Sequence, residues 1–193
     1  FNPDARARKN ALSRLILAAR VIPRALFSPI IFNSQGEVWF SGGELSWWRM
    51  RALHRKAICV RTEGSEDFLT GCALFFPLTV VDSVGEFDES YFLYYEDTDF
   101  CVRAKQSGFQ LCVVPESEVD HEEVSQAHPQ KTYYLVYSGL LFFFKHTSGI
   151  KTGYMRMYAT IRRLKNWVDC LLFGGKEAAL VQQAYGDFFR KKH

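Results

Sequence analysis

The sequence lacks a long apolar run, a C-x-x-C pair and a marked excess of charge of either sign. Its longest apolar stretch, residues 133–144, falls well short of the roughly 20 residues that a membrane-spanning helix needs. The five cysteines are odd in number and widely spaced, which argues against a disulfide framework or a zinc site and favours a reducing compartment. A net charge of +3 is too small to indicate nucleic acid as the main partner. These absences predict a cytoplasmic protein that does not bind nucleic acid.

The composition is that of an ordinary folded domain. The 193 residues are 48% hydrophobic, which suffices for a sizeable core, and 23% charged, which does not indicate disorder. The charge is unevenly distributed along the chain. Residues 150–193 carry nine Lys/Arg and three Asp/Glu, a net charge of +6. Residues 1–149 carry fifteen Lys/Arg and eighteen Asp/Glu, a net charge of −3. A mildly acidic body is therefore followed by a basic tail.

Mixed helical and strand signals predict an α/β fold. Leu12, Leu15 and Ile16 share one helical face ahead of Pro23. The further expected elements are strands at 25–32 and 37–41, a surface loop at 44–66, a buried strand at 71–76, helices at 79–84 and 96–107, and a strand at 110–114 that Pro115 ends. From residue 129 the pattern is helical, with breaks at Gly149, Gly153 and Gly174-Gly175. We therefore expect a main part at residues 1–128 and a helical extension at residues 129–193.

The most informative segment is an aromatic run that leads directly into three carboxylates, Glu96, Asp97 and Asp99. Apolar surroundings reduce the hydration of a carboxylate and strengthen its electrostatic interactions, which suits a general base. A helix start also favours the ionised form. Acidic residues are common in first helical turns simply as caps, so the composition alone leaves both interpretations open.

The wider pattern resembles family 2 glycosyltransferases. It consists of TGCAL at 70–74, VGEFDE at 84–89, FLYYEDTDFCVRA at 92–104, GF at 108–109 and VP at 114–115, in that order. The resemblance implies the C-terminal, acceptor-side part of a GT-A fold with a helical tail. It also implies an inverting transfer of a sugar from a nucleotide-sugar donor to a hydroxyl acceptor. In that case Asp97 is the base, while Glu96, Asp99 and Gly71 hold the acceptor or the local geometry. Arg103, one turn beyond Asp99, is placed to pair with it.

The start of the sequence, Asn2-Pro3-Asp4, resembles the family's metal-binding motif. The resemblance implies that Asp4 binds a divalent cation, Mg²⁺ or Mn²⁺, and that His121 completes the metal or diphosphate site. Alone, such a tripeptide is usually a turn or a cap, and a lone histidine is usually structural. Since the motif opens the sequence, we expect the strands that bind the nucleotide to be absent from it. Ser125 matches a family serine.

Other residues have two interpretations each. Gly42 and Gly43 resemble a glycine pair that lets the backbone approach the donor, but a tight turn explains them as well. The tryptophans Trp39, Trp47 and Trp48 could stack on a sugar or belong to a core.

The segment 131–141 resembles the family's Y-Y-x-x-R-N-x-L-L helix, with Tyr137-Ser138 in place of Arg-Asn. Together with the Asn-Pro-Asp motif it leans towards rhamnosyltransferase-like members, and so towards a glycan or lipid-linked acceptor. The basic tail fits an amphipathic helix on the inner face of an anionic membrane or a solvated helix face. Two alternatives to an enzyme stay open, namely a non-catalytic carbohydrate- or nucleotide-binding remnant and a membrane-surface scaffold.

Overall fold

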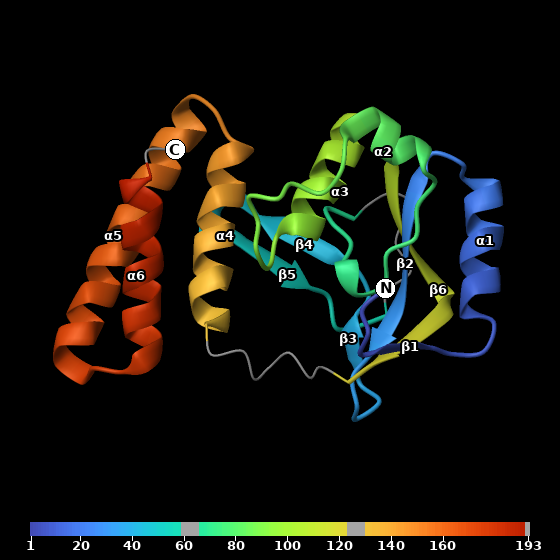
Figure 1. Ribbon diagram of the computed structural model, residues 1–193, viewed down its shortest axis with the longest axis horizontal. Coiled ribbons are helices and arrows are strands. Elements are labelled where there is room, and N and C mark those ends of the chain that lie inside the picture. The colour runs from blue at the N-terminus through green and yellow to red at the C-terminus, as the bar shows by residue number, and fades with distance from the viewer. Residues whose placement is uncertain (59–65, 123–129, 192–193) are drawn as a thin grey trace. The chain divides into compact units, whose positions relative to one another are not determined.

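The structure, a computed structural model, describes residues 1–58, 66–122 and 130–191. These residues form two compact units, each of which draws on several stretches of the chain. The first contains residues 1–46, 52–89 and 96–125, and the second contains residues 47–51, 90–95 and 126–193. Figure 1 labels their elements, and each unit is described by itself below. The expected boundary at residue 128 lies outside the described residues.

The first unit is built on a four-stranded sheet of order β1-β6-β2-β3. The central strands β2 (Ala25–Phe32) and β6 (Gln110–His121) run parallel, while β1 (Ala5–Ala7) and β3 (Val38–Phe40) are antiparallel to their neighbours. Seven residues of β2, 25–31, are buried, as expected for an apolar strand covered on both faces. The predicted strand at 25–32 is confirmed.

Helices cover both faces of this sheet (Figure 1). On one face, Leu15 of α1 (Ala11–Val21) packs with Phe27 and Cys112. On the other face, Phe100 of α3 (Glu96–Gln106) packs with Leu26 and Leu111, and α2 (Thr79–Val84) contributes Val80 to the same core. The predicted helices are confirmed. Gly85 and Gly108 follow α2 and α3 with left-handed φ angles of 76° and 84°, the conformation that ends helices.

Strand β6 is longer than expected, because Pro115 does not end it. Pro29 lies opposite Val114, but the next residue of β2, Ile30, lies opposite Glu118, so residues 115–117 form a bulge. A proline without an N–H donor is tolerated in a bulge. The buried Ser117 hydroxyl donates to the Ala11 carbonyl at 3.0 Å and fixes the bulge to the start of α1. Beyond the bulge the strand continues to His121.

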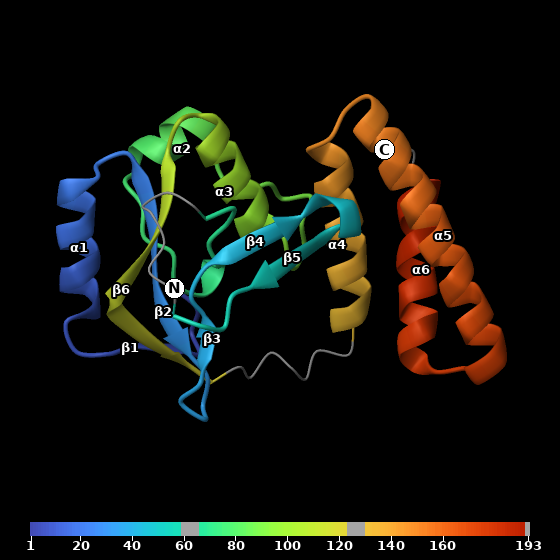
Figure 2. The ribbon, with the colours of Figure 1, turned by 180° about the vertical axis from the view of Figure 1, so that it is seen from behind.

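Two further expectations were wrong. The apolar segment 71–76 is not a strand: it begins with the 3₁₀ turn η2 (Gly71–Ala73), and only Phe75 makes a β-bridge, to Phe27. The segment 44–66 is not all loop, because β4 (Gly43–Ser46) pairs with β5 (Arg51–His54) around the 3₁₀ turn η1 (Trp47–Arg49). Figure 2 shows this hairpin.

The second unit contains α4 (Lys131–Lys145), α5 (Ile150–Phe173) and α6 (Lys176–Arg190). Leu140, Ala159 and Tyr185, one from each helix, share a buried cluster. The expected breaks at Gly149 and Gly174-Gly175 are confirmed, whereas Gly153 lies inside α5. A single interior glycine weakens a helix only modestly, so the apolar face of a 24-residue helix overrides it. Within the described ranges, no helix combines the length and apolar character required to cross a bilayer.

Arg103 forms an ion pair within α3 and also joins this helix to the end of α2. The Asp99 side chain is fully buried, and its carboxylate accepts from Arg103 Nε at 2.8 Å, as the spacing predicted. Arg103 also donates to the carbonyls of Val84 and Glu86.

We expect Arg103→Met to lower the free energy of unfolding by about 3 kcal/mol, because it leaves a buried carboxylate without its cation. Urea unfolding measures the change. The control is Arg14→Met, which removes an exposed arginine of α1, and its effect should stay within about 0.5 kcal/mol. Equal effects of the two substitutions would show that the pair does not stabilise the fold.

Candidate functional site

The predicted base, Asp97, is held by the 3₁₀ turn that follows Thr70. The Thr70 hydroxyl caps this turn by accepting from the Cys72 amide at 3.3 Å. The capped turn directs the Gly71 amide at Asp97, whose Oδ2 accepts from it at 2.6 Å. A short hydrogen bond to a carboxylate is a strong one, so the turn fixes the position of Asp97.

The second oxygen of Asp97 is bound locally. Its Oδ1 accepts from the Thr98 amide at 2.6 Å and from the Thr98 hydroxyl at 3.1 Å. A carboxylate offers about four lone-pair sites, and these three bonds leave it able to accept another proton donor. Asp97 is thus rigidly oriented and chemically available.

Gly71 lies close to the Asp97 side chain. A Cβ added to Gly71 would lie 3.3 Å from the Asp97 Cβ, a tight contact, and 3.5 Å from its Oδ2, an ordinary one. A side chain at position 71 would therefore require the turn or the carboxylate to shift slightly. The geometric role predicted for Gly71 has a physical basis in this approach, while contact with an acceptor stays a prediction.

Glu96, the neighbour of Asp97, differs from it in environment. Its Oε2 atom is buried and has no hydrogen-bond partner among the described residues. Burial, followed by the negative charge of Asp97, raises the pKa of Glu96 from 4.5 to about 7. A carboxyl group near neutrality can donate as well as accept a hydrogen bond.

The backbone just before α3 adopts an unusual conformation. Tyr94 and Tyr95 both have left-handed φ angles, 65° and 68°, which bulky residues rarely adopt and which the surroundings must stabilise. In the second unit, the Ser138 hydroxyl donates to the Leu93 carbonyl at 2.7 Å, and a Cβ on Gly139 would lie 3.2 Å from the Tyr95 ring. The residues that replace the family's Arg-Asn pair in α4 therefore lie in the helix that supports the aromatic run.

The predicted metal ligands are brought together by the ladder between β1 and β6. Ala5 lies opposite His121, and the preceding residue, Asp4, has its Oδ2 3.2 Å from His121 Nε2. The imidazole is only 4% exposed, and neither of its ring nitrogens has a hydrogen-bond partner in the part of the chain that is described. A buried imidazole without hydrogen bonds beside a carboxylate fits a divalent cation.

The side chains of the described residues do not by themselves complete such a site. Over the described ranges, no group of three or more His, Cys, Asp or Glu side chains is arranged to hold a metal ion. Mg²⁺ is typically bound through one or two carboxylates with water and substrate phosphates. The pair of Asp4 and His121 suits a cation that arrives with a phosphorylated substrate.

The turn connects Asp97 with the metal motif. The Asn2 amide donates to the Cys72 carbonyl at 2.9 Å, while the preceding residue, Gly71, binds Asp97. The pKa of the Cys72 thiol is raised to about 12, first by burial and then by the negative charges of Asp4 and Asp97. Both carboxylates therefore lie near the same buried thiol.

Trp39 was not assigned to this site from the sequence, yet its ring packs against His121. The two ring centroids are 4.8 Å apart in an edge-to-face arrangement, and His54 packs on Trp39 at 4.7 Å. Trp47 and Trp48 belong to the second unit, where Trp47 stacks on Phe142 at 6.0 Å. Stacking of the three tryptophans on a sugar stays a prediction, whereas the contact of Trp39 with His121 is part of the structure.

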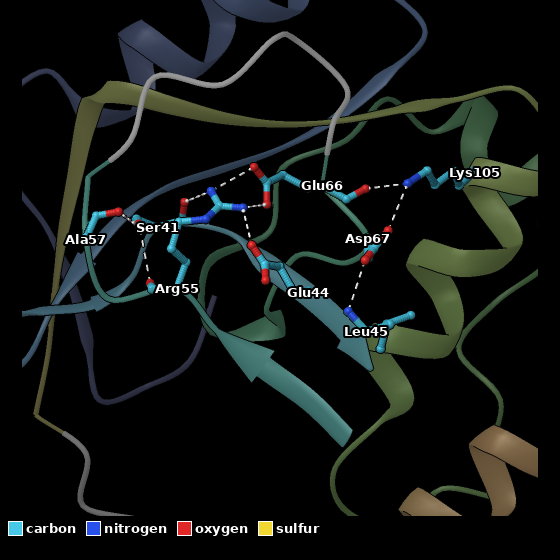
Figure 3. A network of polar contacts seen from close by, with 8 residues as sticks. All are labelled: Ser41, Glu44, Leu45, Arg55, Ala57, Glu66, Asp67 and Lys105. Carbon is cyan, nitrogen blue, oxygen red and sulfur yellow. Dashed lines mark hydrogen bonds and ion pairs between the residues drawn. The ribbon is translucent and has the colours of Figure 1, made fainter. Parts of the chain in front are cut away.

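Gly42 packs against a buried ion pair that the sequence did not predict, and Gly43 packs against Phe68. Arg55 donates to both carboxylate oxygens of Glu66, at 3.0 and 2.8 Å, within the polar network of Figure 3. A Cβ on Gly42 would lie 2.3 Å from Glu66 Oε2, and one on Gly43 would lie 2.5 Å from the Phe68 ring. Packing therefore suffices to explain both glycines, and their contact with a donor stays a prediction. Ser125 lies outside the described residues.

Comparison with known proteins identifies similar sequences. A model of the glycosyltransferase-like family 2 matches residues 48–135. Two relatives, the N-acetylglucosaminyl-diphospho-decaprenol L-rhamnosyltransferases of Mycobacterium tuberculosis strains CDC 1551 and H37Rv, are each 27% identical to this chain. Each match covers 68% of this chain and 52% of the relative, so the chain spans about half the length of the curated relatives it matches. The predicted resemblance and the mixed α/β fold with a helical C-terminal part are confirmed.

The environment of Glu96 generates a prediction about stability and pH. Its raised pKa means that the folded protein keeps a proton that the unfolded chain releases between about pH 4.5 and 7. Stability should therefore fall as the pH rises through this range. Glu96→Gln cannot ionise, so it should remove this loss and stabilise the protein at pH 8 by up to about 3 kcal/mol relative to the parent.

Urea unfolding at pH 5 and pH 8 tests this prediction. The matched control is Glu116→Gln, an exposed glutamate in the bulge of β6, which should leave the pH dependence unchanged. A Glu96→Gln variant with the parent's pH dependence would contradict the assignment.

Proposed function

We propose that this chain, which resembles family 2 glycosyltransferases, is the acceptor-side, catalytic part of an inverting glycosyltransferase. One observation carries the proposal. The single turn Gly71–Ala73 binds the Asp97 carboxylate through the Gly71 amide at 2.6 Å and accepts from the Asn-Pro-Asp motif through the Cys72 carbonyl at 2.9 Å. The proposed base and the segment that carries Asp4 are thus held by the same turn, which supports a role for both in transfer from a nucleotide-sugar.

The proposed reaction is a single displacement. The acceptor oxygen forms a bond to the anomeric carbon of the sugar as the bond from that carbon to the diphosphate oxygen breaks. The proton of the acceptor hydroxyl passes to Asp97, and the bonding electrons leave with the nucleoside diphosphate. A base fixed before the substrate arrives avoids reorganisation at the moment of reaction, which is a main source of catalytic rate.

Glu96 is proposed to orient the acceptor. With its pKa near 7 it carries a proton for much of the time at neutral pH, so it can donate a hydrogen bond to an acceptor oxygen that approaches Asp97. Two adjacent carboxyl groups with different environments can then have different tasks.

Asp4 and His121 are proposed to hold a divalent cation, Mg²⁺ or Mn²⁺. When bound, the cation supplies positive charge that stabilises the diphosphate as it leaves. The role of this chain is to keep a carboxylate and an imidazole 3.2 Å apart in a buried position. Trp39 holds the imidazole ring from one side.

The substrate classes are proposed from the relatives. Their name describes L-rhamnosyl transfer to N-acetylglucosaminyl-diphospho-decaprenol. We propose that the donor is a nucleotide-activated deoxyhexose and that the acceptor is a hydroxyl of a lipid-linked sugar, as in the synthesis of a bacterial polysaccharide.

We expect Asp97→Asn to lower the turnover number of the full-length enzyme by about 10²–10⁴-fold, because the amide keeps the shape but cannot take the proton. Donor affinity should change little, since Asp97 does not hold the donor. Steady-state kinetics and calorimetric donor binding separate the two quantities. Asp82→Asn, at an exposed position of α2, is the control and should match the parent. Normal turnover of Asp97→Asn would reject Asp97 as the base.

The cation site is tested separately, by Mn²⁺ binding in the presence of a nucleoside diphosphate, followed by electron paramagnetic resonance. Asp4→Asn and His121→Gln each remove one of two protein ligands. Mutation of a residue that only hydrogen-bonds to a metal ligand typically weakens metal binding by roughly 10–100-fold. Because Asp4 and His121 are proposed as the ligands themselves, we expect each substitution to weaken Mn²⁺ binding by more than this. His54→Gln alters the histidine on the other side of Trp39 and should leave the affinity unchanged. Unaltered Mn²⁺ affinity in Asp4→Asn and His121→Gln would exclude this site.

A further inference from the structure

Helix α5 carries a row of large apolar side chains that stay exposed among the described residues. Their relative exposures lie between 43% and 91%. We call them the apolar stripe: Ile150, Met157, Ile161, Leu164, Val168 and Leu171. The buried residues of the same helix, Met155 and Ala159, lie on its other side. The hydrophobic positions of α5 thus form two opposite faces, of which only one is used in packing.

The stripe is continuous along the helix. Its members are separated by seven, four, three, four and three residues, which keeps them on one face of a helix with 3.6 residues per turn. At 1.5 Å per residue the stripe is about 32 Å long. Leu172 and Phe173, 68% and 82% exposed, extend it at the C-terminal end of α5. A contiguous exposed apolar surface of this kind is typical of an interaction site.

Cationic side chains border the stripe on both sides. Lys165 neighbours Ile161 and Val168 at helical spacings of four and three, while the exposed Arg156 lies on the opposite border, beyond Thr160. The acidic residue of α5, Asp169, is paired with Lys165 at 2.7 Å. Residues 150–193 have a net charge of +6. The partner that covers the stripe should therefore be apolar within and negatively charged at its surface.

We propose that the apolar stripe inserts into the interfacial region of an anionic membrane, with α5 parallel to the membrane surface. An amphipathic helix with a basic border binds such a surface by burying its apolar face while its cations reach the lipid phosphates. Trp167, 51% exposed at the border, has the amphipathic ring that favours this depth. The absence of a spanning helix among the described residues agrees with a helix that lies on the membrane.

A second copy of the chain fits this surface less well. Self-association through the stripe would bring two segments of net charge +6 together, and like charges at close range oppose association. The membrane proposal rests on exposure and charge, so it does not depend on the proposed sugar transfer. A failed vesicle experiment would leave that transfer untouched.

Vesicle co-sedimentation of the full-length protein tests the proposal. The vesicles contain equal parts of phosphatidylglycerol and phosphatidylcholine, with phosphatidylcholine alone for comparison. Leu164→Glu places a charge at the centre of the stripe. Its matched control is Leu12→Glu, because Leu12 on α1 has the same relative exposure, 58%. Circular dichroism checks that both variants are folded.

We expect the parent and Leu12→Glu to bind the anionic vesicles and Leu164→Glu to bind at least about tenfold more weakly. Arg156→Gln should weaken binding to the anionic vesicles by on the order of fivefold, the effect of one basic residue. Its binding to neutral vesicles should not change, and salt should weaken binding to the anionic vesicles only.

Three outcomes would overturn the proposal. They are a parent protein that does not bind anionic vesicles at low salt, equal losses in Leu164→Glu and Leu12→Glu, and a parent dimer that Leu164→Glu dissociates without any binding to vesicles. The last outcome would identify a second copy as the partner of the stripe.

Discussion

The hydrogen bond from the Gly71 amide to Asp97 Oδ2 is the contact on which the site depends. At 2.6 Å it joins the turn η2 to the start of α3, and the next carbonyl of the same turn accepts from Asn2. Backbone groups make both contacts, so the positions of the carboxylates follow from the path of the main chain. A site held in this way is preorganised, as the proposed general-base chemistry requires.

Local patterns predicted the elements that local forces determine. The strand at 25–32, the helices α1, α2 and α3 and the ion pair of Asp99 with Arg103 all follow from spacing, caps and glycines within a few residues. The predicted strand at 71–76 was wrong because the Thr70 side chain caps a 3₁₀ turn there, and this outweighs the β preference of a short apolar run. Strand β6 was cut at Pro115 because its continuation depends on β1, more than 100 residues away in sequence. A ladder of that kind leaves no local signal.

The same distinction applies to the site. The role of Asp97 and the partnership of Asp4 with His121 were inferred from a family resemblance, and the geometry now gives the pair a physical basis at 3.2 Å. The ring contact of Trp39 with His121 and the buried pair of Arg55 with Glu66 were missed, because each joins residues from separate elements. Gly42 and Gly43 illustrate the converse, since these motif positions are explained by packing, of Gly42 against that buried pair and of Gly43 against Phe68.

The basic tail left two explanations open at the level of sequence, and the exposed side chains of α5 are the observation on which the membrane proposal rests. A solvated helix face would present its charges outward and bury its leucines, whereas here one row of apolar residues packs and a second row stays exposed. The affinity of such a helix for a membrane is moderate and reversible, unlike that of a spanning segment. Reversible attachment would suit the proposed transfer from a soluble donor to a lipid-linked acceptor, because it would confine the search for the acceptor to a surface while leaving the donor free to exchange.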